Sequence, residues 1–139
     1  MKKRLYILTA FLLFSSSNFA LSQTSSTHNT YYDSAITLLI NGDYDNALSS
    51  INKAIKINPT NADSYYIRGN VYQKKANYLY AIRDYQKAIK LNPNHIDATI
   101  KCGVSYSKMN DKATACIYIK RACDMGNKDG CNIFYKFCK

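Results

Sequence analysis

The spacing of apolar residues predicts amphipathic helices from about residue 30 onward. In each of the first two segments, apolar side chains recur every three or four residues, which places them on one face of a helix. These residues are Tyr31, Ala35, Leu38 and Leu39 in the first segment, and Ala47, Leu48, Ile51, Ala54 and Ile55 in the second. The pattern therefore predicts a pair of helices.

Residues with special backbone preferences mark the ends of this pair. Asn41-Gly42 ends the first helix, because glycine readily adopts the left-handed conformation found after helix C-termini. Asp43 is a favourable N-cap for the second helix. Asn58-Pro59 ends the second helix, because the residue before a proline is held outside the helical region.

The end of the second helix occurs twice in the chain. Residues 53–59 read KAIKINP, and residues 87–93, 34 positions later, read KAIKLNP. A fixed period of this length is typical of helical arrays, in which each unit buries its apolar face against the next. We expect an all-α protein with helix pairs at about residues 30–57, 62–91 and 96–125 and a final short helix at about 128–138.

The second unit carries the clearest pattern of residue types. An aromatic residue, a small residue and a Tyr on its first helix are followed by Ala, an aromatic residue, Ala and a closing Pro; these are Tyr65, Gly69, Tyr72, Ala81, Tyr85, Ala88 and Pro93. This pattern resembles the tetratricopeptide repeat (TPR), with Arg68 in place of the usual Leu. Gly69 and Ala81 are small where the two helices would cross, so we interpret the stripe as core packing.

The flanking units are weaker copies of the same repeat. The first has Tyr31, Ala35, Leu38, Ala47, Ile51, Ala54 and Pro59. The third keeps Gly103, Tyr106, Ala115, Ile119 and Ala122 but has Thr99 for the aromatic residue and Asn127 for the Pro. The resemblance implies a right-handed superhelical array of three TPR helix pairs plus a C-terminal capping helix. We expect the units at residues 30–61, 62–95 and, in degenerate form, 96–125, and a capping helix stapled by disulfides at residues 126–139.

The N-terminus has the features of a secretory signal peptide. Basic residues at positions 2–4 precede an apolar run from Leu5 to Phe14, which is shorter than the roughly 20 residues that cross a bilayer. We expect a signal peptide at residues 1–22, cleaved after Ser22 or alternatively at Ala20, and a disordered leader at residues 23–29. Because no Cys follows the apolar run, we expect no lipid anchor and a periplasmic or secreted protein.

All five cysteines lie in the last third of the chain. In an exported protein this distribution indicates disulfides. Folding the chain back at Asn127 brings Cys123 opposite Cys131 and Cys116 opposite Cys138. The sequence therefore predicts two cross-links in one helical hairpin.

A second fold-back competes for Cys116, because the crossing of the third helix pair would also bring Cys102 near it. Residues 122–131 are also similar to the cysteine-rich helical repeats of secreted bacterial proteins, in which two Cys separated by seven residues clamp adjacent helices. Structural zinc needs ligands two to four residues apart, and no two Cys are closer than seven. Cys-x-x-Cys, the usual redox motif, is missing. We expect no metal site.

The sequence has no constellation typical of catalysis. The two His residues, His28 and His95, have no nucleophile motif nearby, and the chain lacks Glu. Capping and helix-dipole effects explain the Asp residues near helix starts; they are Asp43, Asp63, Asp97, Asp111 and Asp129. Gly-rich phosphate loops and His/Glu metal motifs are absent. We expect a protein that is not an enzyme and uses no cofactor.

The chain is basic, with a net charge of +10 that falls to +7 when the basic residues at positions 2–4 are removed. Its lysines are spread over every repeat without a run of five or more, which is typical of a solvated surface rather than of nucleic-acid binding. We therefore expect no nucleic-acid partner.

The geometry of a helical array suggests where a ligand would bind. Stacked helix pairs curve, and the first helix of each pair lines the concave side. The expected groove residues are Tyr32, Ile36 and Leu39, then Tyr66, Asn70, Gln73 and Lys74, then Lys101, Val104 and Lys108. This surface runs from apolar to basic and suits a peptide or helix with an apolar end and an acidic end.

We therefore expect an adaptor that binds another protein or peptide. Chaperone-type members of the family grip a terminal carboxylate with Lys and Asn on these helices, and only Asn70 and Lys101 match that arrangement. The alternatives are a binder of anionic surfaces or polysaccharide, a small cell-wall-related enzyme, and a passive spacer within a larger assembly.

Overall fold

The computed structural model describes residues 23–139, which form helices joined by short turns and contain no strand. Residues 23–40 are helical, and the helices that follow are α2 (Tyr44–Ile57), α3 (Ala62–Lys74), α4 (Tyr78–Leu91), α5 (Ile96–Lys108), α6 (Lys112–Asp124) and α7 (Lys128–Phe137). These bounds confirm the predicted all-α array of helix pairs with a short final helix.

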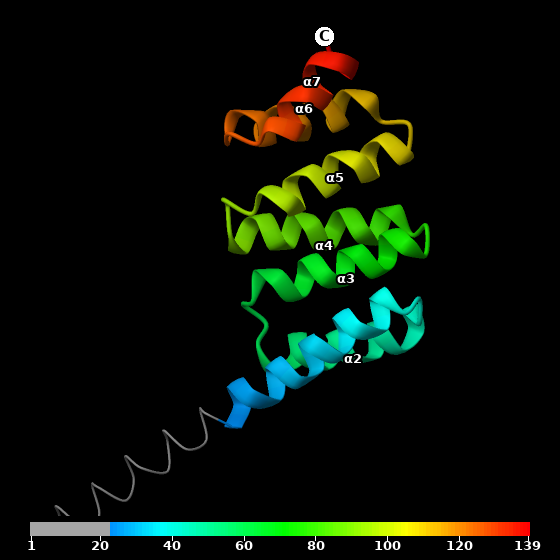
Figure 1. Ribbon diagram of the computed structural model, residues 1–139, viewed down its shortest axis with the longest axis vertical. Helices are drawn as coiled ribbons and strands as arrows, with labels where there is room; N and C mark the ends of the chain where they lie inside the picture. Colours follow the sequence, from blue (N-terminus) through cyan, green and yellow to red (C-terminus); the bar gives the residue numbers. More distant parts are fainter. Residues whose placement is uncertain (1–22) are drawn as a thin grey trace, which may run out of the picture.

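The helices stack in chain order along one axis (Figure 1). The helix of residues 23–40 lies with α2 at one end of the stack, and α7 with the C-terminus lies at the other. Each helix therefore packs mainly against its neighbours in the sequence. The predicted signal peptide, residues 1–22, lies outside the described residues.

Residues 23–29 correct the expectation of a disordered leader, because they are helical and continuous with residues 30–40. His28 is buried in the packing of this helix against α3, and its Nε2 is joined to the Ser64 hydroxyl by a hydrogen bond of 3.1 Å. Thr27 and Thr30 also donate hydrogen bonds to carbonyl oxygens one turn earlier. Polar composition suggested disorder, but a contact with the second unit orders the segment.

The turn within each helix pair is built the same way in all three pairs. Gly42, Ala76 and Asn110 recur every 34 residues, and all have a positive φ, at 80°, 58° and 63°. In each turn the next residue's N–H donates to the carbonyl four places before the positive-φ residue, as from Asp43 to Leu38 (2.9 Å). This is the arrangement that commonly closes a helix C-terminus. The sequence pattern identified it only at Gly42.

Polar side chains cap the N-termini of most of the helices. Asp43, Asn61, His95, Asp111 and Asn127 each accept a hydrogen bond from a backbone N–H three residues ahead. Each bond satisfies one of the N–H groups that the first turn of a helix leaves free. The prediction that Asp43 caps α2 is confirmed.

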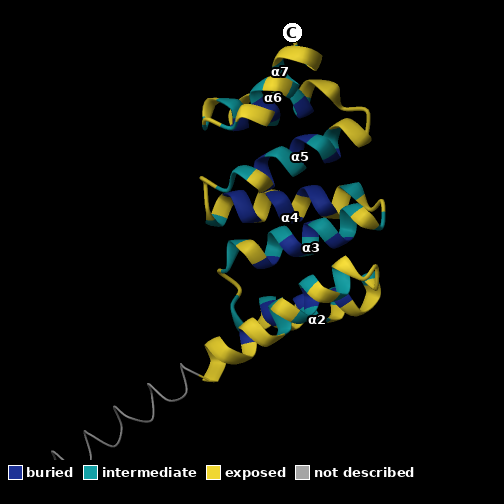
Figure 2. Ribbon diagram, viewed as in Figure 1, coloured by how far each residue is buried: buried dark blue, intermediate teal, exposed yellow. Residues whose placement is uncertain are grey.

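The core lies in the middle of the stack and consists of two clusters. One contains Ala81, Ile82, Tyr85, Ala88, Ile89, Ala98 and Cys102. The other contains Ala35, Ile51, Ala54 and Ile67. Tyr66 packs against both clusters and so connects them. Figure 2 shows the buried residues concentrated in the central helices and exposed residues dominating the two ends.

Two disulfides tie the last helices together. Cys123 is bonded to Cys131, and Cys116 to Cys138. These are the two bonds predicted from folding the chain back at Asn127. Cys102 is buried and unpaired, and the alternative Cys102–Cys116 bond is not formed. Burial raises the pKa of the Cys102 thiol to about 12. This thiol is therefore protonated and inert near neutral pH.

Candidate binding surface

The predicted groove residues lie on the first helix of each pair. The helix of residues 23–40 carries Tyr32, Ile36 and Leu39; α3 carries Tyr66, Asn70, Gln73 and Lys74; and α5 carries Lys101, Val104 and Lys108. The array places them in sequence along the stack (Figure 1). Their side chains nevertheless fall into three different environments.

At the N-terminal end, the groove residues pack into the core more than they face solvent. Tyr32, Ile36 and Leu39 are half-buried and contact the cluster that contains Ile51. The Tyr32 ring also stacks on His28, with ring centroids 6.0 Å apart, and burial raises the pKa of its hydroxyl. This part offers a partly exposed apolar surface.

In the middle, the side chains join neighbouring helices. Tyr66 contacts the rings of Tyr85 and His95, at centroid distances of 6.0 and 4.8 Å. The Tyr85 hydroxyl donates to Asn70 Oδ1 at 2.8 Å, and burial raises the pKa of that hydroxyl, which keeps it a neutral donor. Gln73 Nε2 donates to the Ser105 hydroxyl at 3.1 Å. These groups hold α3, α4 and α5 in register.

At the C-terminal end, Val104 and Lys108 line a hollow of about 540 Å³ between α5, α6 and α7. The residues around it are Gly103, Val104, Ser107, Lys108, Asn110, Lys112, Ala115, Cys116, Ile119, Ile133, Phe137 and Cys138. Its volume is within the usual range of ligand-binding pockets.

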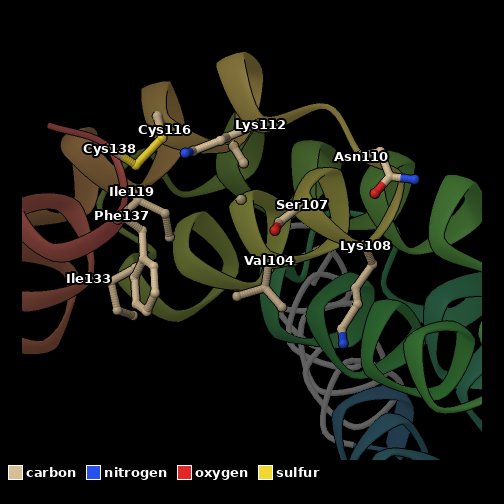
Figure 3. A pocket seen from close by; sticks show the side chains of 12 residues that line it. Val104, Ser107, Lys108, Asn110, Lys112, Cys116, Ile119, Ile133, Phe137 and Cys138 are labelled. Carbon is tan, nitrogen blue, oxygen red and sulfur yellow. A yellow bond between two sulfur atoms is a disulfide. The ribbon is translucent and has the colours of Figure 1, made fainter.

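The hollow has apolar walls and a polar rim. Figure 3 shows Ile119, Ile133 and Phe137 on one side, with Val104 opposite. On the rim, the Lys112 amine extends toward the Cys116–Cys138 disulfide, whereas Lys108 extends away from it. Within residues 23–139, neither lysine forms an ion pair. The hollow therefore combines an apolar interior with an available positive charge.

Sequence reasoning predicted only part of this site. It named Val104 and Lys108 as expected groove residues but did not name Ser107, Lys112 or Phe137, because it considered only one face of the first helices and treated the final helix as a cap. The cysteine spacing held the missing signal, since the Cys116–Cys138 bond holds the end of α7 beside α6.

The histidines have structural surroundings. His95 Nδ1 accepts from the Ala98 N–H at 3.3 Å and caps α5, while its Nε2 lies 3.3 Å from Asp63. His28 is bonded to Ser64. Within the described part of the chain, no group of three His, Cys, Asp or Glu side chains is arranged to hold a metal ion. No helix there is both long and apolar enough to span a bilayer.

Two models of one protein family match the chain. The model described as "TPR repeat" matches residues 37–75, and the model described as "Tetratricopeptide repeat" matches residues 62–95. A comparison with curated protein sequences finds no match.

Solved structures with the same helical arrangement include the crystal structure of MamA, with 27% identity and a TM-score of 0.71 over 74% of this chain. The chain spans 60% of that protein and 54% of a second MamA structure, so it is shorter than both. The TPR2B domain of yeast Sti1 in complex with pHsp70 has 22% identity and a TM-score of 0.75, over 81% of this chain and 96% of that one.

The first TPR of Spaghetti (RPAP3) bound to the HSP90 peptide SRMEEVD has 18% identity and a TM-score of 0.76, over 81% of this chain and 91% of that one. At this identity the likeness shows the fold alone. Together with the matched repeats and the observed helix pairs, it identifies the chain as a tetratricopeptide repeat protein whose C-terminal region carries two disulfides.

Proposed function

We propose that this chain is an exported protein–protein interaction module that binds a peptide or helix along the surface formed by the helix of residues 23–40, α3 and α5. The observation that carries the proposal is the hollow beside α5, because it continues this surface and is lined by Val104 and Lys108. TPR structures of the same fold include complexes with pHsp70 and with an HSP90 peptide.

The groove residues fall into two groups according to their contacts. Tyr66, Asn70 and Gln73 are engaged with neighbouring helices, so they shape the surface. Lys74 is exposed and Lys101 is half-buried, and neither side chain forms an ion pair within residues 23–139. Among the described residues these two lysines, like Lys108, are free to pair with an acidic segment of a ligand.

Export is supported by two independent features. The chain begins with the basic and apolar segments of a signal peptide. Two disulfides in the C-terminal region fit an oxidising compartment. Expression in a bacterium should yield a mature protein that begins at Gln23, in the periplasm or the medium. Retention of Met1 in the membrane fraction, determined by intact mass, contradicts this part of the proposal.

A capture experiment tests the binding function. The mature protein is immobilised, incubated with envelope extract and cross-linked, and the captured partners are quantified by mass spectrometry. The groove variant Lys74→Gln/Lys101→Gln should recover its partners several-fold less than wild type, and cross-links in wild type should map to α3 and α5.

The matched control is Lys56→Gln/Lys90→Gln, which removes two exposed lysines from the second helices α2 and α4. This control should capture partners as wild type does. The groove is rejected as the binding surface if the groove variant and the control capture the same amount of partner. It is also rejected if neither variant captures any partner. Salt-sensitive binding to anionic vesicles or polysaccharide that both variants weaken equally indicates a surface binder instead.

A further inference from the structure

We propose that the hollow between α5, α6 and α7 binds a peptide segment in which a large apolar side chain stands next to an acidic one. The apolar side chain would lie against Val104, Ile119 and Phe137, and the carboxylate would pair with Lys112. This inference rests on the proposed function and names the chemistry of its ligand.

The interior of the hollow determines the apolar half of this ligand. Ile133 and Phe137 from α7 and Ile119 from α6 form its walls, with Val104 from α5 opposite. Phe137 is 56% exposed although it is a large apolar side chain. Covering it with a ligand side chain would remove that apolar surface from water, at about 25 cal/mol for each Å².

The rim determines the acidic half. Lys108 and Lys112 both line the hollow, and neither has an acidic partner among the described residues. The neighbouring carboxylate of Asp111 is used in capping α6, where it accepts from the Thr114 N–H at 3.0 Å. Lys112 is the lysine that extends over the disulfide side of the hollow (Figure 3). A ligand carboxylate would therefore find an uncompensated charge there.

The exposure of the rim favours a polypeptide over a fatty acid. Ser107, Lys108, Asn110 and Lys112 are all exposed, so a chain can pass over the hollow instead of ending inside it. The Ser107 hydroxyl and the Asn110 amide are hydrogen-bonding groups of the kind that peptide backbone requires. An alkyl chain has no groups that could hydrogen-bond to either side chain.

One wall of the hollow depends on a covalent bond. Phe137 is the last residue of α7, and Cys138, which follows it, is bonded to Cys116 on α6. A helix end beyond the last packed turn frays readily unless it is tied down. Loss of the Cys116–Cys138 bond should therefore remove Phe137 from the site, whereas the Cys123–Cys131 bond at the other end of α7 should matter less.

The test uses blocked hexapeptides, N-acetylated and C-amidated, which contain Phe-Asp or Asp-Phe between Gly-Ser and Ser-Gly. They are titrated to about 5 mM into the mature protein with labelled methyl groups, a range that covers weak peptide affinities. The methyl resonances of Val104, Ile119 and Ile133 should shift. The Asp peptides should bind about threefold more tightly than the same peptides with Asn, as expected for one exposed ion pair.

Two pairs of variants identify the source of this preference. Lys112→Gln should abolish the discrimination between Asp and Asn, whereas Lys120→Gln, on the same helix but outside the hollow, should preserve it. Cys116→Ser/Cys138→Ser should weaken binding at least fivefold. Cys123→Ser/Cys131→Ser should weaken it less, and circular dichroism checks that both proteins are helical.

Several results would overturn the inference. These are the absence of shifts at the three methyl sites, equal affinities for the Asp and Asn peptides in the wild type, and identical behaviour of the two lysine variants. Tighter binding of decanoate than of the peptides at the same methyl groups would assign the hollow to a lipid. The capture experiment can still show groove-dependent binding when the peptide titration fails. The proposed function and this inference are therefore tested separately.

Discussion

Arg68 clamps the carboxylate of Asp84 with two hydrogen bonds, from Nε to Oδ2 and from Nη2 to Oδ1, each 2.7 Å long. Arg68 lies on α3 and Asp84 on α4, and a third bond of 2.8 Å runs from Arg68 Nη1 to Asn52 on α2. One guanidinium therefore connects three helices, at the position where the repeat pattern usually has Leu.

Arg68→Leu should lower the free energy of unfolding by about 3 kcal/mol, because it leaves a buried carboxylate without its partner. The Asp84 side chain is 7% exposed, and burial raises its pKa despite the opposing bonds from Arg68. Without Arg68 this pKa rises further, so the variant should lose stability as the pH rises from about 4 to 7. Urea unfolding at both pH values measures the loss.

The double variant Arg68→Leu/Asp84→Leu is the control for that measurement. Replacing both members of a buried ion pair with apolar residues is often neutral or stabilising. It should therefore recover most of the stability that Arg68→Leu loses. A double variant as unstable as the single one would show that packing around Arg68, rather than its charge, is what matters.

Ala76→Gly should stabilise the protein by up to about 1 kcal/mol. Ala76 has φ 58°, a left-handed conformation that costs a residue with a Cβ roughly 1–2 kcal/mol, partly offset by the greater freedom of glycine in the unfolded chain. Thermal unfolding measures the difference.

Gly42→Ala is the reciprocal change in the first turn, where φ is 80° and an added Cβ would meet nothing within 4 Å. Backbone strain alone should therefore destabilise it, by about 1 kcal/mol. Opposite signs for the two variants support the shared turn geometry. A loss of stability in Ala76→Gly would count against it.

The sequence predicted the helix pairs well because their boundaries depend on local chemistry, such as the cap at Asp43 and the turn at Asn58-Pro59. It failed at residues 23–29, where order depends on the contact of His28 with Ser64, 36 residues away. The hollow was also beyond reach of the repeat pattern. The hollow exists because α7 packs beside α6, and residues 126–139, which include α7, do not follow the repeat.

Gly69→Ala should destabilise the protein by about 1–3 kcal/mol, although alanine favours helices. A Cβ at this position would lie 2.6 Å from Cε1 of Tyr85, which is fully buried and whose hydroxyl donates a hydrogen bond to Asn70. The ring or the helix must therefore move. Denaturant unfolding measures the change, and an increase in stability would show that the α3–α4 crossing has room to spare.

Gly103→Ala provides the comparison in the next pair. Its added Cβ would lie 3.0 Å from the Cδ1 atom of Ile119, a side chain that can rotate, and 3.1 Å from the carbonyl oxygen of Ala115. Its loss should be smaller than that of Gly69→Ala. Comparing the two losses of stability tests whether the rigid Tyr85 ring makes the α3–α4 crossing tighter than the α5–α6 crossing.

The native, oxidised protein should contain no thiol that reacts with maleimide at pH 8. Cys102 is the only cysteine outside the two disulfides; it is fully buried and its pKa is raised to about 12. Unfolding without reductant should expose one thiol, and unfolding with reductant should expose all five cysteines. Mass spectrometry counts the labels. A label on any other cysteine in the native protein contradicts the pairing.

Ionisation of the same thiol should lower the stability of the folded protein at alkaline pH. Because the pKa of Cys102 is higher in the folded protein than its ordinary value of 9.0, folding is favoured while the thiol is protonated. That contribution is complete below pH 9 and is lost as the pH rises toward 12. Cys102→Ala should therefore lose less stability than wild type between about pH 8 and pH 10.5. Parallel declines would assign the alkaline loss to the tyrosines.

The two disulfides should contribute unequally to stability. The sequence separation is 22 for Cys116–Cys138 and 8 for Cys123–Cys131, so the chain-entropy model gives about 3.4 and 2.5 kcal/mol. Replacing the first pair with Ser should therefore lower the unfolding free energy more, and it should also release the end of α7 from α6. Urea unfolding of the two double variants tests the order, and peptide mapping without reductant verifies the remaining bond. A larger loss from the shorter loop would mean that the turn at Asn127, rather than loop closure, is what the disulfides secure.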